Sequence, residues 1–521
     1  MFNLTKYLLK QISYTCLLAL SSGLVLQADE KPNILFITMD DMNYDSIGSY
    51  GCEIPNISPH IDSLADQGLR FIYAYNQTSS CVPSRNVYQT GRYPHSNGVL
   101  SFYNVDTDFL TLPELLKNAG YFTACVNKPR DTSITDQYDK YWDYQVIMTG
   151  PPKRNGAYYA EHFKKALNNA KDEKKPFYCV VNIADPHKPF YNDQKGIQQG
   201  FDTYRPSTEF TVDDVSIPAF LPKHPKIREE MRNYYNSVKR GDDCVGAVLK
   251  ILEESGLKED TVIVFISDHG MPLPYAKSSL YPDGLRTPWI ITWPGKIELG
   301  TVDDQHLVSA IDFKPTILDI ANVPQPKGIQ GKSKIDIIEG KKDPSRDVVF
   351  AEFNDNAGGI AFPMRAVHTK DFLYVFNVWG TGKNKFVSAA TWYPSEGVMK
   401  GMAKKNPEVA KRYNFLIHRC VEEFYDLRKD PHVLKNLIDA PEHQERIESF
   451  RARLQGWMEE TDDYLIEAFA ARDDVSELQA IYEKLDAESL KRAEKLQWKR
   501  YKNRIGGTGK NKELYQLRTA R

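Results

Sequence analysis

A cysteine within a short polar stretch is the residue whose setting points most directly to chemistry. The stretch reads Ser79-Ser80-Cys81-Val82-Pro83-Ser84-Arg85 and continues to Thr90-Gly91-Arg92. Serines suit a helix cap, Pro83 suits a first helical turn and Gly91 suits a helix exit, so the sequence predicts a helix that begins at Cys81. Because the N-terminus of a helix attracts anions, we expect Cys81 to lie at an anion-binding position.

Four apolar runs in the chain each end abruptly in polar or charged residues. The runs cover residues 33–39, 121–127, 178–184 and 261–267, and they lead into Asp40-Asp41, Lys128, Asp185-Pro186-His187-Lys188 and Asp268-His269-Gly270. Taken singly, each polar group is more simply a turn residue, a cap or a solvated side chain, and an isolated cysteine is more simply a small buried hydrophobe. The shared position at the ends of the runs favours a common site instead.

The same runs predict the fold class. They are too short for helices and apolar on both faces, which is typical of strands covered on both sides. Helical patterns at residues 112–119 and 242–254 lie between them, so we expect an α/β domain with a mainly parallel, doubly wound sheet sandwiched by helices. Ligands of such sheets gather at the carboxyl ends of the strands, where all four polar clusters fall. Residues 364–378 and 422–427 predict strands of a smaller antiparallel sheet.

Four parts of the chain can be predicted. Lys6 and Lys10, an apolar run at residues 14–26 and the small residue Ala28 indicate a signal peptide, and the run is too short for a comfortable membrane span. We therefore predict a secreted or periplasmic protein with no stable membrane span. The predicted parts are a signal peptide at 1–28, a catalytic domain at 29–360, an antiparallel subdomain at 361–470 and a charged helical tail at 471–521.

Composition narrows the class of partner. The 521 residues are 41% hydrophobic and 26% charged, as in soluble globular proteins. A formal net charge of −2 gives no general attraction to nucleic acid or to an anionic surface. The six cysteines that follow the predicted signal peptide form no Cys-x-x-Cys pair, so the sequence does not predict a disulfide scaffold.

The cysteine motif resembles the signature of the type I sulfatases of the alkaline phosphatase superfamily. The order Asp-Asp, Cys-x-Pro-Ser-Arg, Lys, His, Asp-His-Gly, Lys over residues 31–437 is similar to that of the family. Several segments look most like the heparan N-sulfatase (N-sulfoglucosamine sulfohydrolase) branch: residues 183–187, 270–274, 363–367, 424–427 and 430–432. The resemblance implies an alkaline phosphatase-like fold, with a large mixed sheet and a smaller C-terminal antiparallel sheet.

The resemblance also implies a cofactor set. In these sulfatases the motif cysteine is oxidised to formylglycine, so Cys81 would be a substrate of a formylglycine-generating enzyme or an anaerobic sulfatase-maturing enzyme. The metal ligands would be Asp40, Asp41, Cys81, Asp268 and His269. Carboxylate oxygens suit Ca²⁺ or Mg²⁺, and His269, where many relatives carry Asn, slightly favours a softer metal. We expect Ca²⁺ first and Mg²⁺ second.

The catalytic roles follow from the same resemblance. Arg85 would hold the hydrated aldehyde, Lys128 and Lys277 would bind sulfate oxygens, and His187 would bind substrate and act as the general acid. Relatives usually carry Gly-Lys-x-His where this chain has Asn127-Lys128-Pro129-Arg130. Arginine cannot accept a proton at neutral pH, so the base of the second half-reaction has no assigned residue. Arg130 is expected to bind sulfate or a sugar carboxylate.

The predicted activity is that of a sulfuric ester hydrolase or a sulfamidase. Its substrate would be a sulfated oligosaccharide, either heparan-like glycosaminoglycan or an algal uronate-containing glycan such as ulvan. Long, Pro-rich loops at 150–156 and 193–225 could wall off the pocket, which favours exo action. Two alternatives remain: a phosphodiesterase or phosphonate hydrolase of the same superfamily, from which the cysteine motif argues away, and a non-catalytic glycan-binding protein, supported only at Arg130.

Overall fold

The computed structural model describes residues 31–343 and 346–498 of the 521-residue chain. The predicted signal peptide and the cation-rich end of the predicted tail, from residue 499, lie outside the described residues. The compact unit that begins at Asn33 contains all the elements discussed below. Among its described helices, none combines the length and the apolar character needed to cross a bilayer. The six cysteines in the described part of the chain are all free.

The larger sheet has the strand order β4-β3-β5-β1-β6-β7-β2-β8 within the described residues. Its strands are β1 Asn33–Asp40, β2 Leu69–Tyr75, β3 Phe122–Val126, β4 Tyr144–Val146, β5 Phe177–Pro186, β6 Thr261–Ser267, β7 Trp289–Thr292 and β8 Thr301–Ser309. Only β7 runs antiparallel to its neighbours, β6 and β2. The sheet is therefore mixed and mainly parallel, which confirms the predicted class.

The four apolar runs form four adjacent strands of this sheet, β3-β5-β1-β6. Ile37 of β1 lies opposite Val181 of β5 on one side and Phe265 of β6 on the other, both in parallel register. Every residue of β3, β5 and β6 is buried, as expected for strands covered on both faces. Because the strands are parallel and adjacent, their polar ends meet at one edge of the sheet.

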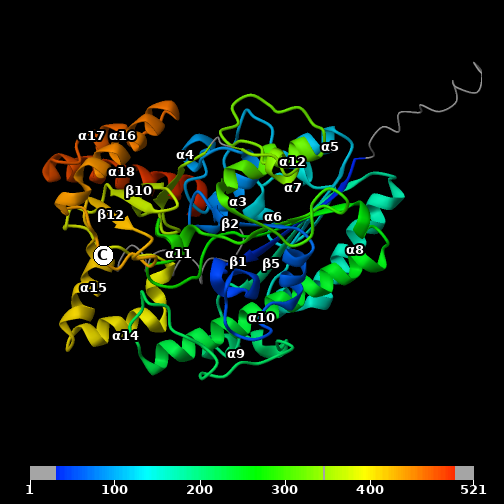
Figure 1. Cartoon of the computed structure of the whole chain (residues 1–521), viewed down its shortest axis with the longest axis horizontal. Helices are drawn as coiled ribbons and strands as arrows, with labels where there is room; N and C mark the ends of the chain where they lie inside the picture. The colour runs from blue at the N-terminus through cyan, green and yellow to red at the C-terminus, as the bar shows by residue number, and fades with distance from the viewer. Residues whose placement is uncertain (1–30, 344–345, 499–521) are drawn as a thin grey trace, which may run out of the picture. The chain divides into compact units, whose positions relative to one another are not determined.

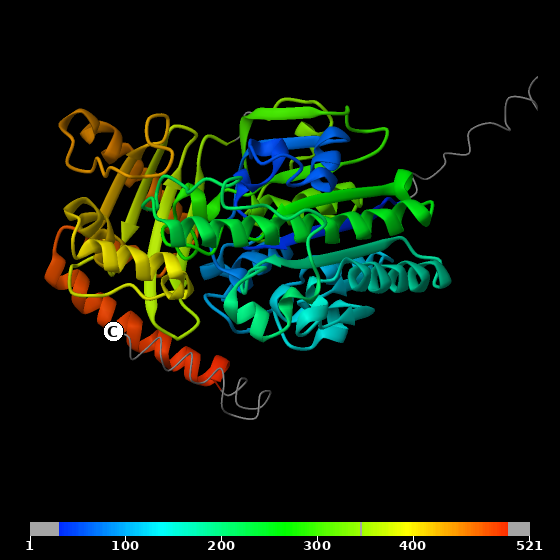
Figure 2. The ribbon, with the colours of Figure 1, turned by 90° about the horizontal axis from the view of Figure 1, so that it is seen from below.

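Helices cover both faces of the sheet (Figure 1). On one face α8 (Gly156–Asp172) and α10 (Pro225–Glu254) lie side by side and contact β5, as Figures 1 and 2 show. On the other, the helix α3 (Cys81–Thr90) and α12 (Phe313–Ile320) pack on β1 through contacts of Phe36 with Tyr88 and Phe313.

Helix α10 approaches the sheet closely at a glycine. A Cβ at Gly241 would clash with the terminal methyl of Met39 of β1 and lie 3.2 Å from Cβ of Asp185, so a larger residue would require Met39 to shift. The helix also begins earlier than the helical pattern that the sequence shows at residues 242–254. The pattern does not reveal the first half of the helix, because that half carries polar side chains that are buried among other polar groups.

The remaining helices of the described residues connect these elements or surround the second sheet. Their bounds are α2 Pro59–Asp66, α4 Pro94–Asn97, α5 Leu112–Asn118, α6 Pro129–Thr132, α7 Tyr138–Tyr141, α9 Gln194–Gln198, α11 Pro282–Leu285, α13 Ile335–Ile338, α14 Pro394–Ala403, α15 Pro407–His418, α16 Gln444–Glu460, α17 Ile466–Ala470 and α18 Val475–Arg492.

The second sheet is antiparallel, with the order β12-β11-β10-β9. Its strands are β9 Val349–Asp355, β10 Ala361–His368, β11 Phe372–Asn377 and β12 Glu422–Asp426. The predicted strand residues 364–378 and 422–427 lie in β10 to β12, whereas β9 precedes the predicted boundary at residue 361. Helices α16 and α18 pack against β10. The expected smaller antiparallel sheet is thus present.

Candidate active site

Helix α3 places Cys81 at its first position, as the sequence predicts. Ser80 is the extended residue before the helix, and Gly91 ends it in the left-handed region at φ 65°. The serine hydroxyls do not cap the helix: Ser79 donates to the carbonyl of Ser279 at 2.6 Å, and Ser84 donates to that of Asp268 at 2.6 Å. These hydroxyls instead tie the helix to the segments that follow β6.

The polar ends of β1 and β6 meet at Cys81. The backbone N–H of Asp41 donates to Oδ1 of Asp268 at 3.0 Å, and Nε2 of His269 lies 3.1 Å from Oδ1 of Asp41. The same imidazole nitrogen is 3.3 Å from the Cys81 sulfur. The structure therefore brings together the five residues expected to be metal ligands: Asp40, Asp41, Cys81, Asp268 and His269.

The donor set fits a hard divalent cation. Oδ1 of Asp40 and Oδ2 of Asp41 are buried and accept no hydrogen bond, which is unusual for buried acceptors, whereas Oδ2 of Asp40 has the Lys128 ammonium as its ion-pair partner. The Nδ1–H of His269 donates to the carbonyl of Gly270 at 2.9 Å, so the lone pair of Nε2 faces the carboxylates. Carboxylate oxygens with one imidazole suit Ca²⁺ or Mg²⁺.

Three cationic side chains balance the three carboxylates one to one. Lys277 Nζ lies 2.6 Å from Oδ1 of Asp41 and 3.5 Å from the Cys81 sulfur. Lys128 pairs with Asp40, and Nη2 of Arg85 lies 2.9 Å from Oδ2 of Asp268. A divalent cation added to this neutral set would leave the pocket with two positive charges. Such a pocket attracts anions.

The pKa shifts follow from these pairs. Burial alone would raise the pKa of Asp40, but the charges of Lys128, His187 and Arg85 hold it well below its ordinary value. Burial opposes the charge of Lys277, yet Asp41 raises the pKa of that ammonium well above its ordinary value. Burial raises the pKa of the Cys81 thiol well above its ordinary value, against the effect of Lys277. An unmodified Cys81 is therefore a neutral thiol at pH 7.

Arg85 is fixed by polar residues that the sequence reasoning missed. Its Nη1 donates to Oγ1 of Thr38 at 2.7 Å and to Oδ1 of Asn182 at 2.5 Å. Thr38 and Asn182 lie in β1 and β5, and their side chains are also hydrogen-bonded to each other. A signal was present, because each is the polar residue within an otherwise apolar run.

His187 lies on the loop after β5 and is partly exposed. Its Nδ1–H donates to the carbonyl of Lys188 at 2.7 Å, and its Nε2 lies 4.0 Å from Oδ2 of Asp41. Burial lowers the pKa of His187 below its ordinary value, although Asp41 opposes the shift. The buried Arg154 fixes this loop through hydrogen bonds to the carbonyls of Ala184 and His187 at 2.6 and 2.5 Å.

Lys128 and the unusual Arg130 lie on a tight turn after β3. Lys128 has a left-handed backbone, at φ 52°, and precedes helix α6. Arg130 lies in the first turn of α6 with a half-buried side chain. The turn thus directs Lys128 toward Asp40, whereas Arg130 belongs to the helix that follows the turn.

Two more residues approach this site from loops distant in sequence. Burial lowers the pKa of Lys153 to about 8, and the charges of Arg154 and Lys128 act in the same direction. Burial raises the pKa of Tyr393, and Lys277 opposes that shift. The sequence analysis predicted that the loop at residues 150–156 walls off the pocket but did not single out Lys153, and it missed Tyr393.

Comparison with known proteins agrees with this geometry. The family model described as Sulfatase matches residues 32–323, and the one described as N-sulphoglucosamine sulphohydrolase, C-terminal, matches residues 268–380. An "Ulvan-active sulfatase" of Formosa agariphila is 28% identical over 478 residues, which cover 83% of this chain and 76% of that protein. The "N-sulphoglucosamine sulphohydrolase" of Homo sapiens is 28% identical over 472 residues, which cover 83% and 90%.

Solved structures share the fold. One, titled "Structure of BT4656 in complex with its substrate D-Glucosamine-2-N, 6-O-disulfate", has a TM-score of 0.63 at 20% identity and covers 84% of this chain and 99% of its own. The phosphonate monoester hydrolase of Agrobacterium radiobacter has a TM-score of 0.59 at 17% identity, covering 82% and 96%. At these identities the likeness concerns the fold alone, so it does not separate sulfate from phosphonate chemistry.

Proposed function

The chain belongs to the sulfatase family, and on that premise we propose that it removes sulfate from the ends of sulfated, uronate-containing oligosaccharides. The nucleophile would be a formylglycine made from Cys81, assisted by a divalent metal, with Ca²⁺ the first choice. One observation carries the proposal: Cys81 begins a helix at the point where three carboxylates, three cations and His269 converge.

The charge balance of the pocket supports sulfate recognition. Without a metal, Lys128 and Lys277 are engaged by Asp40 and Asp41. A divalent cation on the carboxylates would release both ammonium groups to pair with the oxygens of an incoming sulfate ester. Lys153, whose pKa is affected by Lys128 and Asp40, would add a further cation near the same position.

The protonation state of Cys81 favours formylglycine over the unmodified thiol as the nucleophile. A buried thiol with a raised pKa is a poor nucleophile, so the unmodified side chain is unsuited to attack on sulfur. Formylglycine would supply a hydrated aldehyde for that attack, and the metal would supply Lewis-acid polarisation of a sulfate oxygen. Lys277, 3.5 Å from the Cys81 sulfur, is close enough to orient whatever group residue 81 carries.

His187 would move a proton at Nε2. Because Nδ1–H donates to the Lys188 carbonyl, Nε2 is the nitrogen that faces Asp41 and the pocket. A proton gained there, once the anionic substrate raises the pKa of the imidazole, can pass to the departing oxygen or nitrogen. Arg154 keeps the loop in place for this transfer.

The substrate class draws support from the relatives. One relative is described as active on ulvan and another as an N-sulphoglucosamine sulphohydrolase, and both names refer to sulfated glycans or sugars. Arg130, which stands where sulfatases of this type usually carry His, would suit the carboxylate of a uronate. Exo action is supported by the long loops at residues 150–156 and 193–225, and Lys153 of the first loop lies near enough to Lys128 and Asp40 for their charges to affect its pKa. Secretion or periplasmic location is supported by the basic, then apolar, residues 1–28.

Mass spectrometry of the peptide that carries residue 81 tests the chemistry. After expression with a maturing enzyme, formylglycine should appear at position 81 and sulfate should be released from heparin disaccharides or trimmed ulvan oligomers. Cys81→Ser should fold normally and lose this release by roughly 10⁴-fold or more, because the nucleophile is absent. Equal activity in the variant, or hydrolysis of phosphonate monoesters in preference to every sulfated glycan, would overturn the proposal. Activity confined to long intact chains would refute the exo component.

A further inference from the structure

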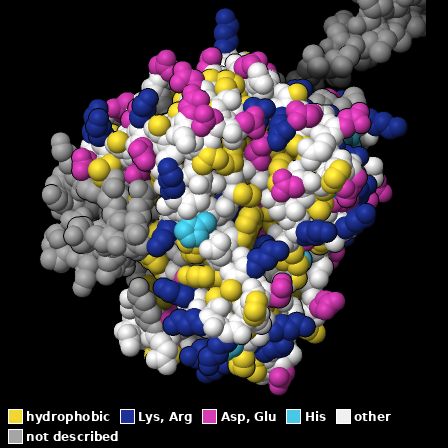
Figure 3. Space-filling model, turned by 90° about the vertical axis from the view of Figure 1, so that its left-hand side faces the viewer, with side chains coloured by type: hydrophobic (Ala, Val, Ile, Leu, Met, Phe, Trp, Pro, Cys, Tyr) yellow, Lys and Arg dark blue, Asp and Glu magenta, His cyan; other side chains and the backbone are white. Residues whose placement is uncertain are grey.

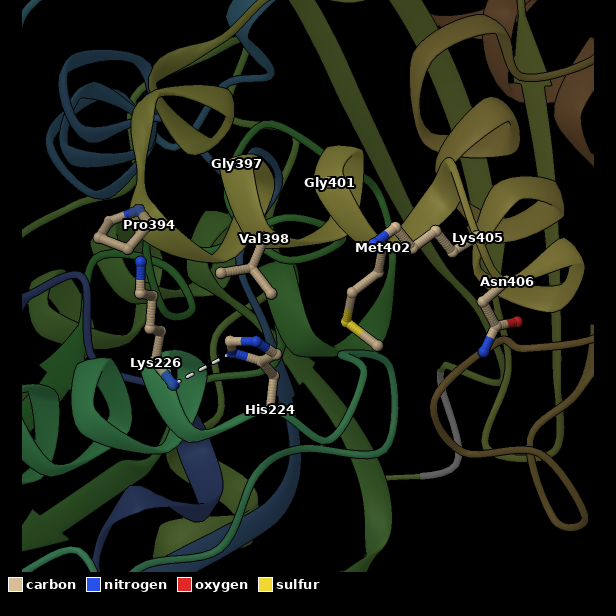
Figure 4. Close-up of a pocket in the computed structure, with 9 residues that line it drawn as sticks. All are labelled: His224, Lys226, Pro394, Gly397, Val398, Gly401, Met402, Lys405 and Asn406. Carbon is tan, nitrogen blue, oxygen red and sulfur yellow. Dashed lines mark hydrogen bonds between the residues drawn. The ribbon is translucent and has the colours of Figure 1, made fainter.

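A groove of about 650 Å³ lies between the start of α10 and helix α14 (Figure 4). Figure 4 shows Val398 and Met402 of α14 directed toward His224, while the side chain of Lys226 reaches across to Pro394. The residues that line it are His224, Lys226, Pro394, Gly397, Val398, Gly401, Met402, Lys405 and Asn406. Gly397 and Gly401 have open space where a Cβ would be, which deepens the groove.

One end of the groove adjoins the active site. Pro394 directly follows Tyr393, whose pKa is affected by Lys277, Asp41 and Cys81. The ammonium of Lys188, the residue after His187, lies over the Tyr393 ring. Lys188 also pairs with Glu230 of α10 at 2.6 Å, and Glu230 accepts the N–H of Ser395 at 2.9 Å. These contacts fix the start of α14 to the loop that carries His187.

The charge of the groove has one sign. Of the residues that line it, Lys226 and Lys405 are exposed cations and none is acidic. Outside the groove, α14 and the start of α15 add the exposed Lys400, Lys404 and Lys411, against one exposed acidic residue, Glu408. Figure 3 shows that Lys and Arg side chains gather on the lower half of this face, over α14 and α15, while Asp and Glu are more frequent above. The surface is therefore complementary to a polyanion, although the whole chain is slightly acidic.

We infer that this groove binds the part of the sulfated glycan that continues beyond the sugar held at residue 81. The inference rests on the proposed function and adds a second binding region to it. From Pro394 to Lys405 the wall of the groove spans roughly 16 Å, enough for more than one sugar unit. Lys226 at the near end and Lys405 at the far end would pair with sulfate or carboxylate groups. Trp392, 45% exposed beside Tyr393, offers a ring face for a sugar between the two regions.

A double variant, Lys226→Gln with Lys405→Gln, tests the inference. Its binding of fluorescent heparin and ulvan hexasaccharides should be about tenfold weaker than that of the wild type at 0.1 M salt. The slope of log affinity against log salt concentration should fall by roughly two, one for each cation removed. The ratio of kcat/KM for hexasaccharide to that for disaccharide should fall by a similar factor, because the disaccharide does not reach Lys405.

A matched control is Lys164→Gln with Lys171→Gln, which removes two exposed cations from α8, outside the groove. This control should bind both hexasaccharides as the wild type does. Equal binding by the groove variant and the control, or a loss shared equally by disaccharide and hexasaccharide, would overturn the inference. If the wild type released no sulfate, the proposed function would fail, and the binding arm would still decide whether the groove holds a sulfated glycan.

Discussion

Two buried clusters in this molecule contain side chains of the kind that bind metals, and they differ in how their acceptors are satisfied. One is the active-site cluster of Asp40, Asp41, Cys81, Asp268 and His269. The other, which we call the Arg365 cluster, consists of His95 of α4, Glu352 of β9, Arg365 of β10 and Asp463 after α16. Three ligand-type side chains lie within reach of one another in both.

In the Arg365 cluster, the guanidinium and the hydrogen bonds around it satisfy the carboxylate oxygens. Nη2 of Arg365 donates to Oδ1 of Asp463 at 2.9 Å, and its Nη1 donates to Asn354 at 3.0 Å. The backbone N–H of His95 donates to Glu352 at 2.7 Å. Among the described residues, no carboxylate oxygen of Glu352 or Asp463 is buried without a hydrogen bond, whereas Oδ1 of Asp40 and Oδ2 of Asp41 are.

The difference shows which property identifies a functional cluster. Burial, residue type and proximity are shared, so they do not distinguish a metal site from a structural ion pair. Unsatisfied acceptors do, because a buried carboxylate oxygen without a partner costs free energy unless something else binds it. We therefore assign the metal to the active-site cluster and a structural role to the Arg365 cluster.

The largest expected effect is at the active-site cluster. Asp268→Asn, or removal of divalent ions by EDTA, should lower sulfate release by at least about 10⁴-fold, because several kcal/mol of transition-state stabilisation depend on the metal. In the wild type, Ca²⁺ at 100 times its Kd should add about 2.7 kcal/mol to the free energy of unfolding, measured as a rise in Tm. Asp268→Asn should lose that rise.

The same measurement on Glu352→Gln provides the contrast, because this change in the Arg365 cluster should lower Tm without altering its response to Ca²⁺. An unchanged rate and melting curve of the wild type in EDTA would rule out the metal site. Rescue by Zn²⁺ and not by Ca²⁺ would correct the choice of ion.

The strand-end residues could be predicted from sequence because local pattern and topology act together on them. Asp40-Asp41 and Asp268-His269 follow apolar runs, and parallel adjacent strands must bring such ends to one edge. Tyr393 and Lys153 could not be predicted, since they reach the site through loops whose paths depend on tertiary packing.

The Arg365 cluster could not be predicted from the sequence either. His95 and Asp463 lie 368 residues apart in the chain (463 − 95), and only the second sheet brings them together. β9 was missed because its apolar run, residues 348–351, is shorter than those of the large sheet and lies between charged residues.

The second effect concerns stability. Arg365→Met should lower the free energy of unfolding by about 4 kcal/mol, because it leaves the buried Asp463 without its paired guanidinium and removes the second cation beside Glu352. Denaturant unfolding monitored by fluorescence measures the change. Arg428→Met is the matched control: Arg428 is half exposed and pairs with Asp426 at 2.7 Å, so its loss should cost no more than about 1 kcal/mol. Equal losses in the two variants would contradict the structural role of the Arg365 cluster.

The smallest effect is a difference in the sign of pH dependence between the clusters. Burial opposes protonation of His95, but Glu352 and Asp463 outweigh both burial and the charge of Arg365, so the pKa of His95 is raised. A raised pKa in the folded state gives stability that is fully present below the unfolded pKa of about 6.5 and is lost as pH rises through the folded pKa. The unfolding free energy of wild type relative to His95→Gln should therefore fall, by roughly 1 kcal/mol, between pH 6 and pH 9.

Two of the active-site carboxylates, Asp40 and Asp41, should show the opposite sign. The pKa values of Asp40 and Asp41 are lowered, since nearby cations outweigh burial, so their contribution is present above an unfolded pKa of about 4 and is lost as pH falls. If His95→Gln instead lost stability chiefly below pH 5, the Arg365 cluster would behave like the active site, and the electrostatic contrast between the two clusters would fail.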